Sequence, residues 1–212
     1  MRENKLKVFL CMLMGYVMGT LSPSALIAKI KKDDLRKKGT GNLGATNVTM
    51  VYGRLLGALV MIFDIGKSFA AFQLAEMIAP DVLADNIPIA GLLASGCAVI
   101  GHIFPFYMKF RGGKGVATLA GMILAYSWIW FLILLGVGFV LMLTFNYGFM
   151  LPCSGAVFFS LITTFETGSK ATFAVTAIAA ALIIWKHVPN MKNVGTEHEI
   201  RARDYIKKHI FK

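Results

Sequence analysis

The chain has 212 residues, of which 57% are hydrophobic and 16% charged, and its mean hydropathy is +0.66. Soluble domains are about a quarter charged, so this composition excludes intrinsic disorder and argues against a soluble enzyme with one small core. The 22 lysines and arginines exceed the 11 aspartates and glutamates, giving a net charge of +11. In a membrane protein such an excess reflects basic cytoplasmic loops, so we expect a lipid bilayer and no nucleic acid as partner.

Apolar runs recur along the whole chain and predict an all-α polytopic membrane protein with seven transmembrane helices. The predicted spans are 6–30, 55–79, 87–106, 116–126, 128–145, 149–165 and 171–185. Several are shorter than the roughly 20 residues that a perpendicular helix needs, which indicates tilted spans or spans extended by polar flanks. A cleaved signal peptide is the alternative for the first run. The dense basic cluster that directly follows this run favours a cytoplasmic anchor instead.

The charges between the runs predict how the chain is oriented. With the N-terminus outside, the segments that fall inside are 31–53, 109–114 and the tail from residue 186, and they carry most of the lysines and arginines. Basic residues favour the cytoplasmic side, so we expect a cytoplasmic C-terminus. Residues 1–212 are expected to form one integral membrane domain.

A glycine-rich segment follows the first run on the predicted cytoplasmic side. It reads DLRKKGTGNLGATN over residues 34–47. Gly39, Gly41 and Gly44 permit positive φ and close approach of a ligand, so consecutive N–H groups can converge on an anion. A flexible turn between helices is the alternative, but the interleaved threonines and asparagines favour an anion site. A nucleotide-binding P-loop is excluded because neither a Walker A lysine-serine pair nor a strand is predicted.

A second segment, GHIFPFYMKFRGGKGVAT at residues 101–118, leads into the fourth run. The sequence GGKG directly before an apolar helix combines backbone N–H groups, the positive end of that helix and the ammonium of Lys114. That combination favours phosphate. A plain cytoplasmic anchor would explain Arg111 and Lys114 but would leave the glycines without a reason.

Charged groups also occur inside the second run, where Asp64 and Lys67 lie three residues apart on one helical face. Charged groups in a span normally face a bundle interior and pair, so either a structural ion pair or a catalytic pair fits. At the end of the last run His187 and Asn190 stand close together, and Glu197 lies in the tail. A histidine at this place is often a plain interfacial residue.

At these positions the sequence resembles the PlsY family of bacterial acyl-phosphate:glycerol-3-phosphate acyltransferases, nearly from end to end. The resemblance rests on the two glycine-rich segments, on Asp64 with Lys67, and on His187 with Asn190 and Glu197. It implies seven spans in the bacterial inner membrane, an outward N-terminus and an active site that faces the cytoplasm. We expect no cofactor and no metal, since the three cysteines lie far apart without CxxC or histidine pairing.

The catalytic candidates are His102 and His187, with the substrate phosphate as a third candidate for the base. The residues expected to bind substrate are Lys29, Arg36, Thr40, Gly41, Asn42, Gly44, Thr46, Asn47, Arg54, Gly112, Gly113, Lys114, Asn190 and Glu197.

Departures from the family pattern concern the acyl acceptor. Met50 stands where the family has an arginine, and Phe149 stands where it commonly has a serine. If the stretch is helical, Arg54 lies one turn beyond Met50 on the same face and compensates for the lost charge. We therefore expect poor use of glycerol-3-phosphate, or another small hydroxyl acceptor. In the third motif, two residues are missing before Glu197 relative to the family.

The resemblance implies attack of a glycerol-3-phosphate hydroxyl on the carbonyl of a fatty acyl phosphate, giving lysophosphatidate and phosphate. An acyl phosphate is an activated mixed anhydride, so positioning and charge stabilisation can do most of the work without a protein nucleophile. Two alternatives stay open. An anion transporter would need polar residues that continue to the outer face, and a catalytically altered paralogue would bind acyl phosphate or phospholipid without turnover.

Overall fold

The computed structural model describes residues 2–79, 88–196, 199 and 201–209. All regular elements among these residues are helices, as expected from the sequence; one isolated antiparallel bridge joins Tyr147 to Arg201. The chain divides into two compact units, Met1–Tyr126 (unit 1) and Ser127–Lys212 (unit 2). The expectation of one domain over residues 1–212 stays a prediction.

Six helical segments of the described residues are long and apolar enough to cross a membrane. They are Glu3–Ile30, Arg54–Ile78, Ile89–Met108, Trp128–Phe145, Met150–Thr167 and Lys170–Lys192. The remaining predicted span forms helix α6 (Val116–Tyr126) with the expected bounds. Its 11 residues extend only about 16 Å, roughly half of the hydrocarbon core, and it packs on α4 and α5. A seven-span count therefore stays a prediction.

The first predicted span is broken in two. Helix α1 (Arg2–Thr20) ends before Leu21, and helix α2 (Pro23–Ile30) begins with a proline at its first position. The Ser22 side chain caps α2 by accepting a hydrogen bond from the Ala25 N–H. Proline has no N–H to continue the ladder of α1, so the Ser-Pro pair fixes the break.

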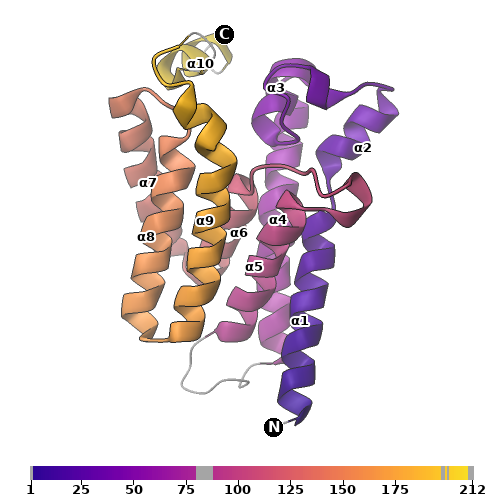
Figure 1. The fold of residues 1–212 in the computed structure, drawn as a ribbon, viewed down its shortest axis with the longest axis vertical. Coiled ribbons are helices and arrows are strands. Elements are labelled where there is room, and N and C mark those ends of the chain that lie inside the picture. The colour runs from indigo at the N-terminus through magenta and orange to yellow at the C-terminus, as the bar shows by residue number, and fades with distance from the viewer. Residues whose placement is uncertain (1, 80–87, 197–198, 200, 210–212) are drawn as a thin grey trace. The chain divides into compact units, whose positions relative to one another are not determined.

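Unit 1 is built on close contact between α1 and α5 (Ile89–Ile103). Gly15 and Gly19 of α1 lie one turn apart, and a Cβ at either would run into the backbone carbonyl of Ala94 or Ala98 in α5. Such pairs of small residues let two membrane helices approach at backbone distance. Helix α4 (Arg54–Ile78) packs on α1, α5 and α6, and Figure 1 shows α1, α4 and α5 running alongside one another.

The first glycine-rich segment connects α2 to α4 at one end of unit 1. It contains the short 3-10 helix η1 (Leu35–Lys37) and helix α3 (Ala45–Tyr52). Gly53 separates α3 from α4 with φ of +96°, a conformation that other residues rarely adopt. Figure 1 places α2 and α3 together at the end of unit 1 opposite the N-terminus.

Unit 2 contains α7 (Trp128–Phe145), α8 (Met150–Thr167), α9 (Lys170–Lys192) and the tail helix α10 (Ala202–His209). Buried hydroxyls join α8 to α9, where Thr176 Oγ1 donates to Ser160 Oγ at 3.1 Å. The tail is held on α7, because the Arg203 guanidinium donates to the Leu143 carbonyl at 2.7 and 3.0 Å. That cation satisfies carbonyl groups that the end of α7 leaves without helical partners.

Candidate functional site

The first glycine-rich loop, residues 33–47, is closed by the side chain of Asn47. Its Nδ2 donates to the carbonyls of Leu35, Lys38 and Asn42 at 2.9 to 3.1 Å, and its Oδ1 accepts from the Thr40 N–H at 2.8 Å. Asn47 is fully buried. The Asn47 side chain was expected to bind substrate. In the structure its hydrogen bonds are made within the loop, where they stabilise the loop conformation.

The glycines of this loop have distinct tasks. Gly39 and Gly41 have φ of +56° and +70°, as the sequence predicts, whereas Gly44 is extended at −134°. Gly44 instead is the N-cap of α3 and provides no side chain to cap the helix.

Several N–H groups of this loop already donate hydrogen bonds within the loop. The N–H groups of Thr40, Gly41 and Asn42 are bound to Asn47, Lys38 and the Thr40 hydroxyl. The loop therefore differs from the expected anion nest at Thr40 to Asn42, and the first-turn N–H groups of α3 are the donors that a helix of this kind leaves available.

A carboxylate anchors the start of the loop. Asp33 accepts hydrogen bonds from Lys38 Nζ at 2.7 Å and from the Tyr52 hydroxyl at 2.9 Å. The Lys38 bond, followed by the Tyr52 bond, holds the pKa of the Asp33 carboxyl below its usual range. Burial, followed by the bond to Asp33, raises the pKa of the Tyr52 phenol. The carboxylate and the neutral phenol are thus the forms that fit this loop.

The second glycine-rich loop, residues 104–115, folds back onto the end of α5. The Gly112 and Gly113 N–H groups donate to the carbonyls of Ile103 and His102 at 3.0 and 3.1 Å. The expectation that these two N–H groups bind phosphate is therefore not met in this geometry. A Cβ at Gly112 would meet the His102 carbonyl, and one at Gly113 would meet the His102 ring. The glycines are needed for close approach to His102.

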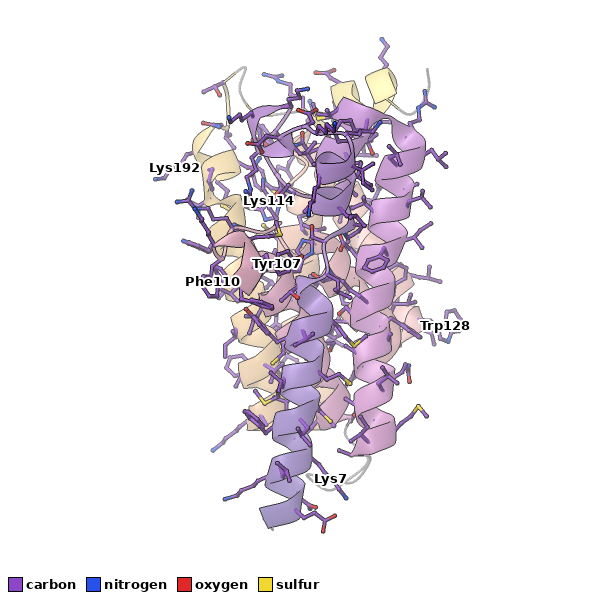
Figure 2. The ribbon with its side chains drawn as sticks, turned by 90° about the vertical axis from the view of Figure 1, so that its right-hand side faces the viewer. Lys7, Tyr107, Phe110, Lys114, Trp128 and Lys192 are labelled. Atoms are coloured by element: carbon purple, nitrogen blue, oxygen red, sulfur yellow. The ribbon has the colours of Figure 1, made fainter. Side chains whose placement is uncertain are left out.

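Two tyrosines fix the second loop to α1. The Tyr16 hydroxyl donates to the Phe104 carbonyl at 2.9 Å, and the Tyr107 hydroxyl, from helix η2 (Phe106–Met108), donates to the Thr20 carbonyl at 2.6 Å. Figure 2 shows Tyr107 and Lys114 in the half of unit 1 away from Lys7, which lies near the N-terminal end of α1. These tyrosines carry no motif signal of their own in a single sequence.

The two loops meet in unit 1. Arg36 Nη2 of the first loop donates to the Arg111 carbonyl of the second at 3.0 Å. A cavity of about 220 Å³ beside the first loop is lined by Lys29 and Arg36, two of the predicted substrate-binding residues, and by Met108 of the second loop. Thr40, Gly41 and Thr46 are exposed and Asn42 is half-buried. Lys114 is half-buried at the end of the second loop, directly before Gly115 and α6.

A buried polar cluster of Asp64, Lys67 and His102 lies next to the second loop. Lys67 Nζ is 2.7 Å from Asp64 Oδ1, 2.7 Å from the Leu21 carbonyl and 3.0 Å from His102 Nδ1. His102 is 7% exposed, and its Nδ1 is 3.5 Å from the same carboxylate oxygen. The ion pair predicted from the i, i+3 spacing therefore includes a histidine and a backbone carbonyl as further partners.

The third motif lies in unit 2. Helix α9 continues to Lys192, so His187 and Asn190 stand on one face of its last two turns rather than after it. His187 Nδ1 is 2.8 Å from the Ile183 carbonyl, which can only accept, so Nδ1 carries a proton and Nε2 carries the lone pair of the neutral ring. Glu197 lies outside the described residues.

Glu199 is the residue that the sequence reasoning missed. Asn190 Nδ2 donates to both of its carboxylate oxygens at 2.8 and 3.2 Å, and Glu199 is 6% exposed. If Glu199 is the motif glutamate, the spacing of the third motif matches the family pattern, which is two residues longer than the spacing to Glu197. The family spacing between Asn190 and the motif glutamate points to Glu199, but Glu197 lies nearer in the sequence and was taken instead.

The positions that depart from the family pattern are also located. Gly53 ends α3, so Met50 and Arg54 belong to different helices and the expected one-turn relation between them is wrong. Arg54 is exposed at the first position of α4. In unit 2 Phe149 is buried and stacked on Tyr147, with ring centroids 5.7 Å apart.

Comparisons with known proteins identify the family. A family model described as glycerol-3-phosphate acyltransferase matches residues 9–197. A glycerol-3-phosphate acyltransferase of Geobacillus kaustophilus is 31% identical over 195 residues, covering 92% of this chain and 95% of that protein.

Two solved structures of PlsY, an integral membrane glycerol 3-phosphate acyltransferase, have the same fold. The glycerol 3-phosphate form is 28% identical with a TM-score of 0.81 and covers 92% of this chain and 94% of its own. The lysophosphatidic acid form is 26% identical with a TM-score of 0.80 and covers 94% and 98%. Together with the apolar helices, these neighbours identify the chain as a multi-pass membrane protein.

Proposed function

The chain belongs to the glycerol-3-phosphate acyltransferase family, and from that premise we propose that it transfers a fatty acyl group from acyl phosphate to glycerol-3-phosphate, giving lysophosphatidate and phosphate. The observation that carries the proposal is the joining of two glycine-rich loops within unit 1 through the bond between Arg36 and the Arg111 carbonyl. Each loop leads into a helix N-terminus, at Ala45 of α3 and at Val116 of α6. The two substrates bring one phosphate each, and a helix N-terminus suits a phosphate.

We assign the acyl phosphate to the first loop and glycerol-3-phosphate to the second. The first loop adjoins the cavity that Lys29 and Arg36 line together with Asp33 and Asp34, and the two cations support a phosphate headgroup there. The second loop presents Lys114 directly before α6, and an ammonium at a helix N-terminus favours a phosphate dianion. Asn190, held by Glu199, stays a proposed substrate-binding residue.

The reaction needs orientation more than it needs a protein nucleophile. A hydroxyl oxygen of glycerol-3-phosphate forms a bond to the acyl carbonyl carbon, and the bond from that carbon to the phosphate oxygen breaks. The phosphate departs with the bonding electrons, and the hydroxyl proton passes to a base. His187, with its Nε2 lone pair, and the departing phosphate, whose second pKa is near 6, are the candidate bases.

We further propose seven spans in the bacterial inner membrane, with the N-terminus outside and the site at the cytoplasmic face. The placement of α2 and α3 at the end of unit 1 opposite the N-terminus supports this orientation (Figure 1), as does the basic residue content of 29–38. A cysteine placed at Lys37 in a variant free of Cys11, Cys97 and Cys153 should react with an impermeant reagent only in permeabilised cells. Reaction in intact cells would reverse the orientation.

The donor is tested by incubating the purified protein with glycerol-3-phosphate and either acyl phosphate or acyl coenzyme A. We expect phosphate and lysophosphatidate in equal amounts from acyl phosphate and no lysophosphatidate from the thioester. Reaction with the thioester alone would overturn the donor assignment. Binding of acyl phosphate without phosphate release would favour the non-catalytic paralogue.

The acceptor is the second point to test, because Met50 stands where the family has an arginine. We propose weak saturation by glycerol-3-phosphate in the native protein and a gain in the Met50→Arg variant. A restored charge-assisted hydrogen bond is worth about 1.5 to 3 kcal/mol, which corresponds to a KM about tenfold to a hundredfold lower. Tight saturation in the native protein without any gain from the arginine would show that other residues hold the acceptor.

A further inference from the structure

The break between α1 and α2 leaves a backbone carbonyl inside unit 1. In a continuous helix the Leu21 carbonyl would accept from the Ala25 N–H, but the Ser22 side chain occupies that N–H. Lys67 Nζ, from α4, donates to the Leu21 carbonyl instead, at 2.7 Å. A carbonyl without a partner is costly within a membrane, so the lysine gives the break a structural partner.

The same ammonium determines the state of a histidine. An ammonium has three N–H donors and no acceptor, so every group at hydrogen-bond distance from it must be an acceptor. The partners of Lys67 are the Leu21 carbonyl, Asp64 Oδ1 at 2.7 Å and His102 Nδ1 at 3.0 Å. The ammonium thus makes hydrogen bonds to the Leu21 carbonyl and to His102 Nδ1 and an ion pair with Asp64, so His102 Nδ1 carries a lone pair. The neutral ring then holds its proton on Nε2.

That Nε2 lies beside the second glycine-rich loop. A Cβ built on Gly113 would have His102 Nε2 as its nearest neighbour, so the ring edge faces this residue. The Gly113 N–H in turn donates to the His102 carbonyl at 3.1 Å. His102 therefore supports the loop that precedes Lys114 with both its backbone and its ring.

We propose that Lys67 is a positioning residue that fixes His102 in the Nε2–H form and ties the second loop to the break in the first span. His102 then serves as a hydrogen-bond donor on the loop side and not as the catalytic base. What this inference says about catalysis rests on the proposed function, whereas the tautomer of His102 does not. His187 has the opposite arrangement, with its proton on Nδ1 toward the Ile183 carbonyl.

The tautomers can be read in the native protein by nitrogen NMR after labelling with ¹⁵N-histidine. The chain has 4 histidines, so single His→Asn variants assign the signals. We expect an unprotonated Nδ1 and a protonated Nε2 for His102, and the reverse for His187, which is the internal control. A protonated Nδ1 on His102 would overturn the proposal, whatever the enzymatic activity.

The role of Lys67 is tested by removing its donors without leaving a buried carboxylate alone. The double variant Asp64→Asn with Lys67→Met removes both charges, and a cooperative thermal unfolding transition in detergent shows that it is folded. We expect mixed tautomers for His102 and a kcat/KM about tenfold to a hundredfold lower in the acyl-transfer assay. A His102 signal that keeps its native form in this variant would show that Lys67 does not set it.

The His102→Asn variant separates a donor from a base. The asparagine Oδ1 can accept from Lys67 in place of Nδ1, whereas the donor at Nε2 is lost. We expect a higher KM for glycerol-3-phosphate with kcat changed by less than about threefold, since a lost ground-state contact acts on KM. A collapse of kcat with KM unchanged would make His102 a base and contradict the proposal. If the native protein gave the expected NMR signals but released no phosphate, the proposed function would fail while the assignment of Lys67 would stand.

Discussion

The two glycine-rich loops of unit 1 are held in opposite ways. The first loop is closed by one of its own side chains, since Asn47 makes four hydrogen bonds to residues 35–42. The second loop is held by its surroundings, through Tyr16 of α1, the carbonyl groups at the end of α5 and, through His102, Lys67 of α4. The first loop is therefore set by local sequence, and the second is set by helix packing.

This difference predicts how each loop responds to substitution. Damage to the first loop should remain local, because its bonds do not depend on how α1, α4 and α5 pack. Damage to the second loop should spread to the packing of three helices, and damage to the helices should reach the second loop.

The largest effect is expected for Asn47→Ala. It leaves three carbonyls and one N–H of the loop without their partner. At about 1 kcal/mol for each lost bond, we expect a loss of roughly 3 to 4 kcal/mol in the free energy of unfolding and little remaining acyl transfer. Thermal unfolding in detergent measures the first and phosphate release the second. Asn47→Asp keeps the acceptor for Thr40 but turns a buried carboxylate toward the three carbonyls, so it should destabilise the protein at least as much as Asn47→Ala. A stable and active Asn47→Ala protein would show that the loop is not closed by this residue.

The second effect in size is expected for Gly113→Ala in the other loop. The added Cβ meets the ring of His102, and overpacking of this kind costs about 1 to 3 kcal/mol. Circular dichroism of the protein in detergent during heating would report a lower Tm. Because this loop depends on the helices, hydrogen exchange should also increase at the end of α5. Exchange that increases only within residues 104–115 would contradict the difference drawn between the loops.

The sequence predicts some of these features and not others for physical reasons. The apolar runs predicted the bounds of α6 and α7 to the residue, since Gly115, Ser127 and Asn146 border them. Helix α3 was not expected, because a segment of only eight residues carries little periodicity. The positive φ of Gly41 follows from residue type, whereas the bonds that occupy Gly112 and Gly113 depend on where α5 ends. A tertiary partner such as Tyr16 has no local signature.

A smaller effect is expected for Gly41→Ala in the first loop. Its φ of +70° costs a residue with a Cβ about 1 to 2 kcal/mol, and that Cβ would lie 3.0 Å from the Arg36 carbonyl. We expect a modest loss of stability and a KM for acyl phosphate about fivefold to tenfold higher. Gly66→Ala is the control, since Gly66 lies in α4 with open space around its Cβ position and should be neutral or slightly stabilised. Equal effects in both variants would show that the positive φ of Gly41 is not what the loop requires.

The smallest effect concerns pH at Asp33. The pKa of this carboxyl is lowered in the folded protein, so its stabilising bonds are fully present above the unfolded pKa of about 3.9 and are lost as pH falls through the folded pKa. Hydrogen exchange of residues 33–41, corrected for intrinsic rates, should therefore rise at acid pH in the native protein. In Asp33→Asn it should be raised already at neutral pH and change little on acidification. A native protein with the same protection at both pH values would contradict a role for the Asp33 carboxylate.

The most direct test of the two-loop site is a pair of KM values measured in one acyl-transfer assay. The first loop is assigned to acyl phosphate and the second to glycerol-3-phosphate. We therefore expect Gly41→Ala to raise only the KM for acyl phosphate and Gly113→Ala to raise only the KM for glycerol-3-phosphate. If both variants raised the same KM, or if each raised the KM of the other substrate, the assignment of one phosphate to each loop would be contradicted.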